Sequence, residues 1–75
     1  MLSSKRYAQL ESIVRSASPN ALRSKRSRQN FAHHIASELQ LNGNRVAQFI
    51  AEMDGLNFFV AEDRALFLEF AALGL

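Results

Sequence analysis

The sequence predicts an all-α fold: one small domain, residues 1–75, built as a compact bundle of four to five short helices. Two features of the composition support this fold class. Apolar residues make up 48% of the chain, which is too many for a disordered protein, while proline occurs once and glycine three times, so that signals for turns are few. The third observation is the spacing of the apolar residues, which follows the period of an amphipathic helix through most of the chain.

The first helix is predicted at about residues 4–16. Its apolar face consists of Tyr7, Leu10, Ile13, Val14 and Ala17. Ser3 or Ser4 can cap its start, because a serine hydroxyl accepts a hydrogen bond from the unpaired amides of a first turn. Ser18 and Pro19 then mark the start of another helix or helical turn, since proline at the first helical position lacks only an amide that would be unpaired anyway.

The next amphipathic helix is predicted at about residues 28–40. Its apolar stripe consists of Phe31, Ala32, Ile35, Ala36 and Leu39. The preceding run RSKRSRQN, residues 23–30, has no apolar residue to hold it against a core. We therefore expect a break or an exposed stretch within this run.

Two further helices are predicted in the second half of the chain. The apolar positions of the first are Val46, Phe49, Ile50 and Met53, at spacings i, i+3, i+4 and i+7. Asn42 is its expected N-cap and Gly55 its expected end. The last helix is predicted at about residues 59–73, a segment rich in Phe, Leu and Ala that is apolar around most of its circumference.

The pair Asn42–Gly43 lies between two of these helical patterns. Asn-Gly is the strongest short signal for a β-hairpin. Both flanks nevertheless have the helical period, so we interpret the segment as two helices joined by about three residues, with a hairpin as the less favoured alternative.

The spacing around this turn resembles that of helix-turn-helix DNA-binding proteins, in particular small repressors of phages and plasmids. The matching positions are Ile35 and Ala36 on the first helix, Leu39 and Leu41 around the turn, and Val46 and Phe49 on the second helix. The match covers residues 33–53 and implies a helix-turn-helix at about 29–53. It departs from the family at Gln40, where glycine is common, and Asn42 and Gly43 could supply the irregular backbone one turn later.

The resemblance implies a regulator of transcription that binds double-stranded DNA. Asn44, Arg45 and Gln48 would contact bases, because their side chains match the hydrogen-bonding edges of adenine and guanine. The residues placed to contact phosphate are Arg23, Lys25, Arg26 and Arg28. Both sets have an alternative explanation. The first could be the solvated face of an ordinary helix, and the basic residues could be a solvated charge run or a flexible basic arm.

The charges of the chain are distributed unevenly. Residues 1–37 contain seven of the nine basic residues and one acid, Glu11, whereas residues 38–75 contain two basic and six acidic residues. Such asymmetry indicates a half that faces a polyanion. RNA is an alternative to DNA for this half, but the aromatic candidates for base stacking, Tyr7 and Phe31, both lie in apolar stripes, so duplex DNA is the stronger expectation.

The final helix has apolar residues on two sides, which predicts a homodimer. A chain of this length buries only about 60% of its unfolded surface, so its own core is small. The residues expected to form the dimer are Leu66, Phe67, Phe70 and Leu73. Burial of this helix in the core of a monomer is the alternative. A second functional hypothesis is a protein-interaction module or inhibitor that binds a partner protein through its basic half or this apolar helix.

The sequence gives little support to catalysis, a cofactor or a metal site. There is no cysteine, which excludes disulfides and thiolate ligands and favours a reducing, cytoplasmic location. His33 and His34 are adjacent and would point about 100° apart on a helix, while His34 and Glu38 alone make a weak ligand set. No apolar run reaches the roughly 18 residues of a membrane span. We therefore expect no enzyme activity, no small-molecule substrate and no membrane insertion.

Overall fold

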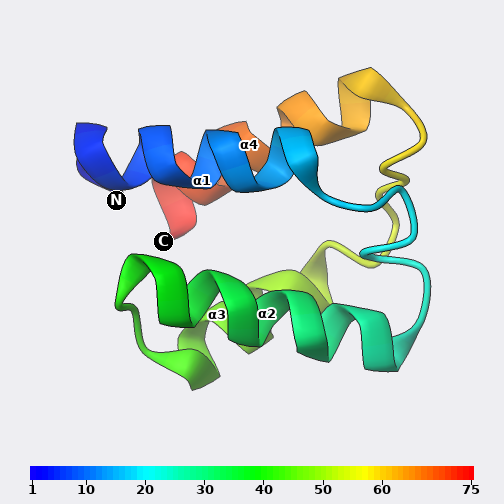
Figure 1. Ribbon diagram of the computed structural model, residues 1–75, viewed down its shortest axis with the longest axis horizontal. Helices are drawn as coiled ribbons and strands as arrows, with labels where there is room; N and C mark the ends of the chain where they lie inside the picture. Colours follow the sequence, from blue (N-terminus) through cyan, green and yellow to red (C-terminus); the bar gives the residue numbers. More distant parts are fainter.

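The computed structural model describes residues 1–75 and contains four helices and no strand. They are α1 (Ser4–Ser16), α2 (Lys25–Leu39), α3 (Gly43–Glu52) and α4 (Ala61–Gly74). In Figure 1, α4 lies behind α1 and α3 lies behind α2, so that the four helices form two layers, and the two ends of the chain lie at the same end of the molecule. The predicted all-α fold is confirmed.

The starts of the helices follow from their capping residues. Ser3 caps α1, with its hydroxyl accepting from the amide of Arg6 at 3.2 Å. α2 begins at Lys25, about three residues earlier than expected, because the hydroxyl of Ser24 accepts from the amide of Ser27 at 3.0 Å. The break expected in the basic run therefore lies at Ser24.

Several of the predicted boundaries differ from the structure. Pro19 begins only a series of turns at residues 19–23 and no helix, so the alternative of a helical turn is the correct one. α3 ends at Glu52, before Gly55, because the amide of Met53 already donates to the carbonyl of Ile50 and closes the last turn. α4 begins two residues later than expected and extends to Gly74.

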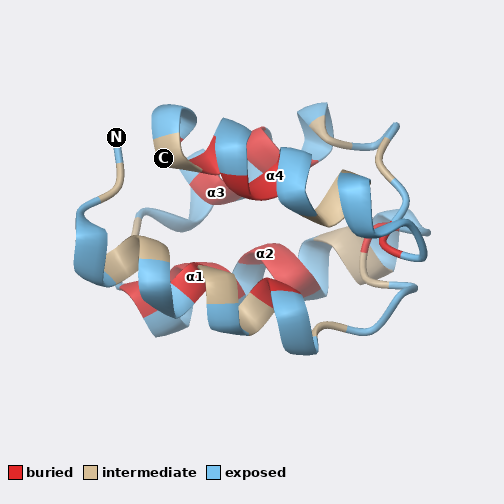
Figure 2. Ribbon diagram, turned by 90° about the horizontal axis from the view of Figure 1, so that it is seen from above, coloured by how far each residue is buried: buried red, intermediate tan, exposed pale blue.

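The core consists only of apolar side chains. No polar or charged residue is buried, so burial of apolar surface is the main term that holds the four helices together. Figure 2 shows the buried residues on the sides of the helices that face one another across the two layers. The core needs no buried polar network to specify it, which suits a domain of this size.

Phe67 of α4 lies at the centre of a cluster of phenylalanine rings. Its ring is 5.4 Å from those of Phe49 and Phe58 in edge-to-face geometry, and 5.9 Å from that of Phe31. Each such pair is worth about 0.5–1.5 kcal/mol beyond the burial of area. Phe67 thereby joins α4 to α2, to α3 and to the segment that connects α3 with α4.

Arginines from other helices close two of the helix ends. The last turns of α2 and α4 contain no basic residue of their own. The Nε atom of Arg6 donates to the carbonyl of Leu39 at 2.8 Å, and the guanidinium of Arg45 donates to the carbonyl of Gly74 at 3.4 Å. Because the last carbonyls of a helix are unpaired and carry partial negative charge, a cation there is stabilising.

Arg64 closes the end of α1 from α4. Its guanidinium donates to the carbonyl of Ala17 at 3.0 Å and to that of Val14, while its Nε atom donates to the carbonyl of Phe58 at 2.8 Å. The guanidinium also lies 5.0 Å from the centre of the Phe58 ring, within the range of a cation–π contact. A single side chain thus joins α1, α4 and the segment between α3 and α4.

None of the four helices is both long and apolar enough to span a lipid bilayer.

Candidate nucleic-acid interface

Gln40 makes the turn between α2 and α3. Its φ of 56° and ψ of 47° put it in the left-handed region, and no other residue of the chain has a positive φ. The amides of Gln40 and Leu41 both donate to the carbonyl of Ala36, which closes the end of α2. Glutamine therefore adopts the conformation for which glycine is the usual residue, and the expectation that the irregular backbone lies at Asn42 and Gly43 is wrong.

The Asn42–Gly43 pair begins α3. The side chain of Asn42 accepts from the amide of Arg45 at 3.1 Å, and Gly43 is the first helical residue. The preference for two helices over a hairpin is confirmed, with Asn42 in the predicted role of N-cap.

The positions that carry the family resemblance lie between α2 and α3. Five of them are buried and Leu41 is half-buried. The buried positions are Ile35, Ala36, Leu39, Val46 and Phe49. Their packing fixes the two helices against each other and turns the opposite face of α3 toward solvent.

This outer face of α3 carries the residues expected to contact bases. Asn44, Arg45 and Gln48 are all exposed. The guanidinium of Arg45 is turned toward the carbonyl of Gly74 at the end of α4, and the bond is exposed to solvent. The one acidic residue of α3 is Glu52, the last residue of the helix. The first nine residues of α3 therefore have no negative side chain.

Of the four side chains expected to contact phosphate, two make no hydrogen bond or ion pair within the protein, and two do. We call the first two the free cations. Lys25 and Arg26 are exposed, in the first turn of α2, and make no hydrogen bond or ion pair within the protein. Arg23 donates to a neighbouring asparagine side chain at 3.4 Å. Arg28 is half-buried and donates to the carbonyl of Leu22 at 3.0 Å. Arg28 therefore holds the turn before α2 in place and is not a free cation.

A groove between α2 and α3 includes one of the two free cations, Lys25, in its lining. Its volume is about 290 Å³, and it is lined by Lys25, Arg28, Gln29, Ala47, Ile50 and Ala51. Sequence reasoning missed Gln29, although it stands four residues after Lys25 and therefore on the same side of the helix. The alanines on the α3 side leave the groove open.

The two expected sets of contact residues lie at opposite ends of the α2–α3 pair. Figure 1 shows α2 running toward the turn and α3 running back from it. Asn44 and Arg45 therefore lie beside the turn, whereas Lys25 and Arg26 lie at the other end of α2, a helix of 15 residues that is about 22 Å long.

The expected dimer residues of α4 do not all lie on one face. Leu66, Phe70 and Leu73 are exposed, but Phe67 is fully buried in the aromatic cluster. The assignment of Phe67 to a dimer interface is therefore wrong, because the core of the single chain already covers its ring.

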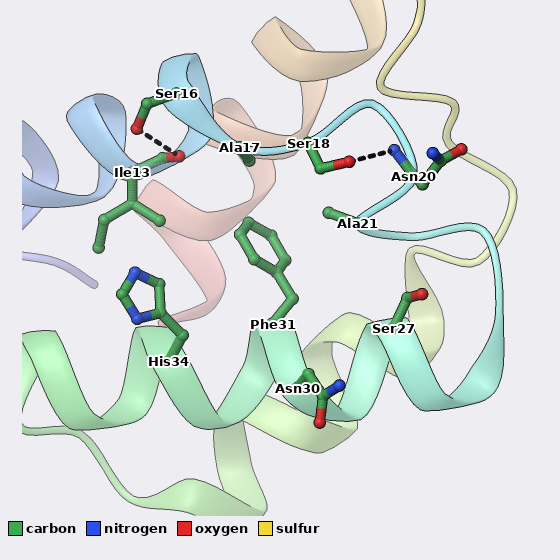
Figure 3. Close-up of a pocket in the computed structure, with 10 residues that line it drawn as sticks. All are labelled: Ile13, Ser16, Ala17, Ser18, Asn20, Ala21, Ser27, Asn30, Phe31 and His34. Carbon is green, nitrogen blue, oxygen red and sulfur yellow. Dashed lines mark hydrogen bonds between the residues drawn. The ribbon is translucent and has the colours of Figure 1, made fainter.

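A second hollow, of about 400 Å³, lies between α1 and α2 (Figure 3). Its lining residues are Ile13, Ser16, Ala17, Ser18, Asn20, Ala21, Ser27, Asn30, Phe31 and His34. The rings of Phe31 and His34 point from α2 toward α1 (Figure 3). The lining contains no lysine, arginine or carboxylate, so this hollow has no fixed charge with which to hold a phosphate.

The histidines form no metal centre. His33 and His34 are both exposed on α2, and nowhere does the structure bring three or more His, Cys, Asp or Glu side chains together in a group that would hold a metal ion.

Comparison of the chain with protein-family models, with curated proteins and with solved structures finds no match.

Proposed function

We propose that this chain is a cytoplasmic regulator that binds double-stranded DNA as a homodimer, with α3 in the major groove. The observation that carries the proposal is the outer face of α3, where Asn44 and Gln48 are exposed and no carboxylate precedes Glu52. Amide side chains of this kind pair with adenine, and Arg45 pairs with guanine once it leaves the Gly74 carbonyl.

Lys25 and Arg26, the free cations at the start of α2, support the proposal that α3 lies in the major groove. A major groove is about 12 Å wide, which is comparable to the length of α3. When the turn end of α3 reaches the bases, Lys25 and Arg26 lie at the edge of the groove, where the phosphates are. The amides of Lys25 and Arg26 have no acceptor within the protein, whereas that of Ser27 donates to Ser24, and the two unpaired amides favour an anion at the start of α2.

The exposed apolar residues of α4 support the homodimer. Leu66, Phe70 and Leu73 have no partner within the chain that covers them. Paired copies of a helix-turn-helix bind two half-sites one helical turn of DNA apart. A dimer also supplies the second set of phosphate contacts that a domain with so few free cations needs for useful affinity.

The test is a fluorescence-anisotropy titration with a fluorescein-labelled 20-base-pair duplex at NaCl concentrations between 50 and 300 mM. Binding should weaken steeply with salt, and Lys25→Ala and Arg26→Ala should each reduce the slope of log K against log salt by about 1.8, because each substitution removes one phosphate contact from both copies of the dimer. On a selected binding site, Arg45→Ala should lower affinity by about 10- to 100-fold.

Arg15→Ala is the matched control for these variants. It removes the same charge from α1, where the side chain is 75% exposed and paired only with Glu11. Its salt slope should equal that of the unmodified chain. No salt-dependent binding to the duplex, or equal slopes for Arg26→Ala and Arg15→Ala, would reject the proposal.

A further inference from the structure

Asn42 and Gly43 combine a chemical reactivity with an exposed position at the start of α3. Of the five asparagines in the chain, only Asn42 is followed by glycine. The side-chain amide of an asparagine can be attacked by the backbone nitrogen of the next residue, and this attack is least hindered when that residue has no Cβ atom. Both residues are exposed, and a Cβ atom on Gly43 would meet no other atom within 4 Å. The approach to the Gly43 nitrogen is therefore open.

The groups that would react are free of competing hydrogen bonds. The amide of Gly43 has no acceptor within the protein, because it belongs to the first turn of α3. The side chain of Asn42 accepts a hydrogen bond through its oxygen and donates none through its nitrogen. Asn44 differs, because Arg45 follows it and the Arg45 amide already donates to Asn42 at 3.1 Å. The start of α3 thus contains one reactive asparagine and one protected asparagine.

The fold holds Asn42 out of the reactive conformation. Ring closure requires the Gly43 nitrogen to be eclipsed with the Cβ atom of Asn42 about the Cα–C bond, and the ψ of 122° turns this nitrogen away from Cβ. The backbone carbonyl of Asn42 accepts from the amide of Val46 at 3.1 Å. Rotation about the Cα–C bond breaks this hydrogen bond, so the reaction requires the first turn of α3 to fray.

We propose that Asn42 is a site of spontaneous deamidation, which proceeds when the first turn of α3 frays. The Gly43 nitrogen gives up its proton and forms a bond to Cγ of Asn42, while the bond between Cγ and the side-chain nitrogen breaks and ammonia leaves. Water then opens the cyclic imide at either carbonyl and yields aspartate or isoaspartate. One water is consumed and one ammonia is released, with no oxidation or reduction.

The two products differ in their effect on the helix. Aspartate keeps the cap, because aspartate and asparagine cap about equally well and a negative charge is favourable at the start of a helix. Isoaspartate adds a methylene to the backbone and displaces the capping oxygen. Either product places a negative charge beside Asn44 and Arg45. The further consequence, weaker binding of DNA by the deamidated chain, rests on the proposed function.

The experiment is incubation of the full chain at pH 8 and 37 °C, with fragment mass spectrometry to follow the conversion of each amide to a carboxyl group. Asn42 should convert at least about tenfold faster than Asn44. In 6 M guanidinium chloride the rate at Asn42 should rise by about 5- to 30-fold, because fraying is no longer required. Gly43→Ala should slow the reaction by about tenfold or more in the denaturant, where the folding of this variant has no influence.

Asn42→Asp measures the effect on DNA binding separately from the chemistry. Its urea midpoint should match that of the unmodified chain, while its affinity for the duplex at 50 mM NaCl should be lower by about 3- to 10-fold. Asn57→Asp is the matched control. Asn57 is also exposed and its side chain accepts from the amide of Phe59 at 2.8 Å, but it lies outside α3. This variant should bind the duplex as the unmodified chain does.

Four results would overturn parts of this inference. Equal conversion of Asn42 and Asn44 excludes the site, and an unchanged rate in Gly43→Ala excludes attack by the Gly43 nitrogen. Equal rates in buffer and in guanidinium chloride exclude the requirement for fraying. Equal duplex affinity of Asn42→Asp and the unmodified chain excludes the effect on DNA. The first three measurements contain no DNA, so failure of the proposed function leaves the deamidation site standing.

Discussion

Replacing Arg64 by alanine should destabilise the domain by about 2–4 kcal/mol. The guanidinium donates three hydrogen bonds to the carbonyls of Val14, Ala17 and Phe58 and contacts the Phe58 ring. A hydrogen bond from a charged group contributes about 1.5–3 kcal/mol when buried. Arg64 is half-buried, so we assign about 1 kcal/mol to each bond after solvent screening.

This loss is large for so small a chain. At about 0.05–0.15 kcal/mol per residue, a domain of 75 residues has a free energy of unfolding of about 4–11 kcal/mol. The alanine variant leaves the end of α1 without its cap and separates α1 from the segment between α3 and α4. The midpoint of thermal unfolding should fall by about 10–25 °C, because 1 kcal/mol corresponds to about 4–8 °C in domains of this size.

Urea unfolding followed by circular dichroism at 222 nm measures the effect. With a slope near 1 kcal/mol per molar urea, the midpoint should fall by about 2–4 M at an unchanged slope. Arg64→Lys should give an intermediate value, because an ammonium keeps the charge but does not reach three carbonyls with the fixed fork of a guanidinium.

Arg15→Ala is the control for Arg64→Ala. Arg15 is 75% exposed and makes one ion pair, with Glu11 at 3.3 Å. Its loss should change stability by less than about 0.5 kcal/mol. Surface ion pairs change the free energy of unfolding by about 0.5 kcal/mol or less. If the free energies of unfolding of Arg64→Ala and Arg15→Ala differ by less than about 0.5 kcal/mol, the assignment of Arg64 as the cap of α1 is refuted.

Two further predictions concern the turn between α2 and α3, and the same urea assay measures both. Gln40→Gly should stabilise the domain by about 0.5–1 kcal/mol, because the left-handed conformation costs a residue with a Cβ atom about 1–2 kcal/mol, more than the added entropy of glycine. A loss of stability would contradict this. Asn42→Ala should destabilise by about 1 kcal/mol through loss of the N-cap, whereas Asn44→Ala, which removes no hydrogen bond within the protein, should change little. Equal effects of these two variants would reject the capping role of Asn42.

The sequence by itself determined the type and approximate position of the four helices, but it left their number at four or five. Periodicity located α1, α2, α3 and α4 because each helix has to bury its apolar positions, and those positions recur every three to four residues. Asn42 was identifiable as a cap, and Ser3 as one of two candidates with Ser4, because capping is local: the side chain bonds to an amide three residues later. The exposure of Asn44, Arg45 and Gln48 followed from the same periodicity, which turns polar positions outward.

The tertiary structure decided which residues act across helices. Packing of α2 against α3 holds Gln40 in a conformation that its own preference disfavours. Arg6 and Arg64 close the ends of helices 33 and 47 residues away in the sequence, a pairing that no local pattern encodes. Phe67 entered the core while Phe70 remained outside, because a helix that is apolar around most of its circumference does not specify its inner side. That side is chosen only by the rings of Phe31, Phe49 and Phe58 that surround it.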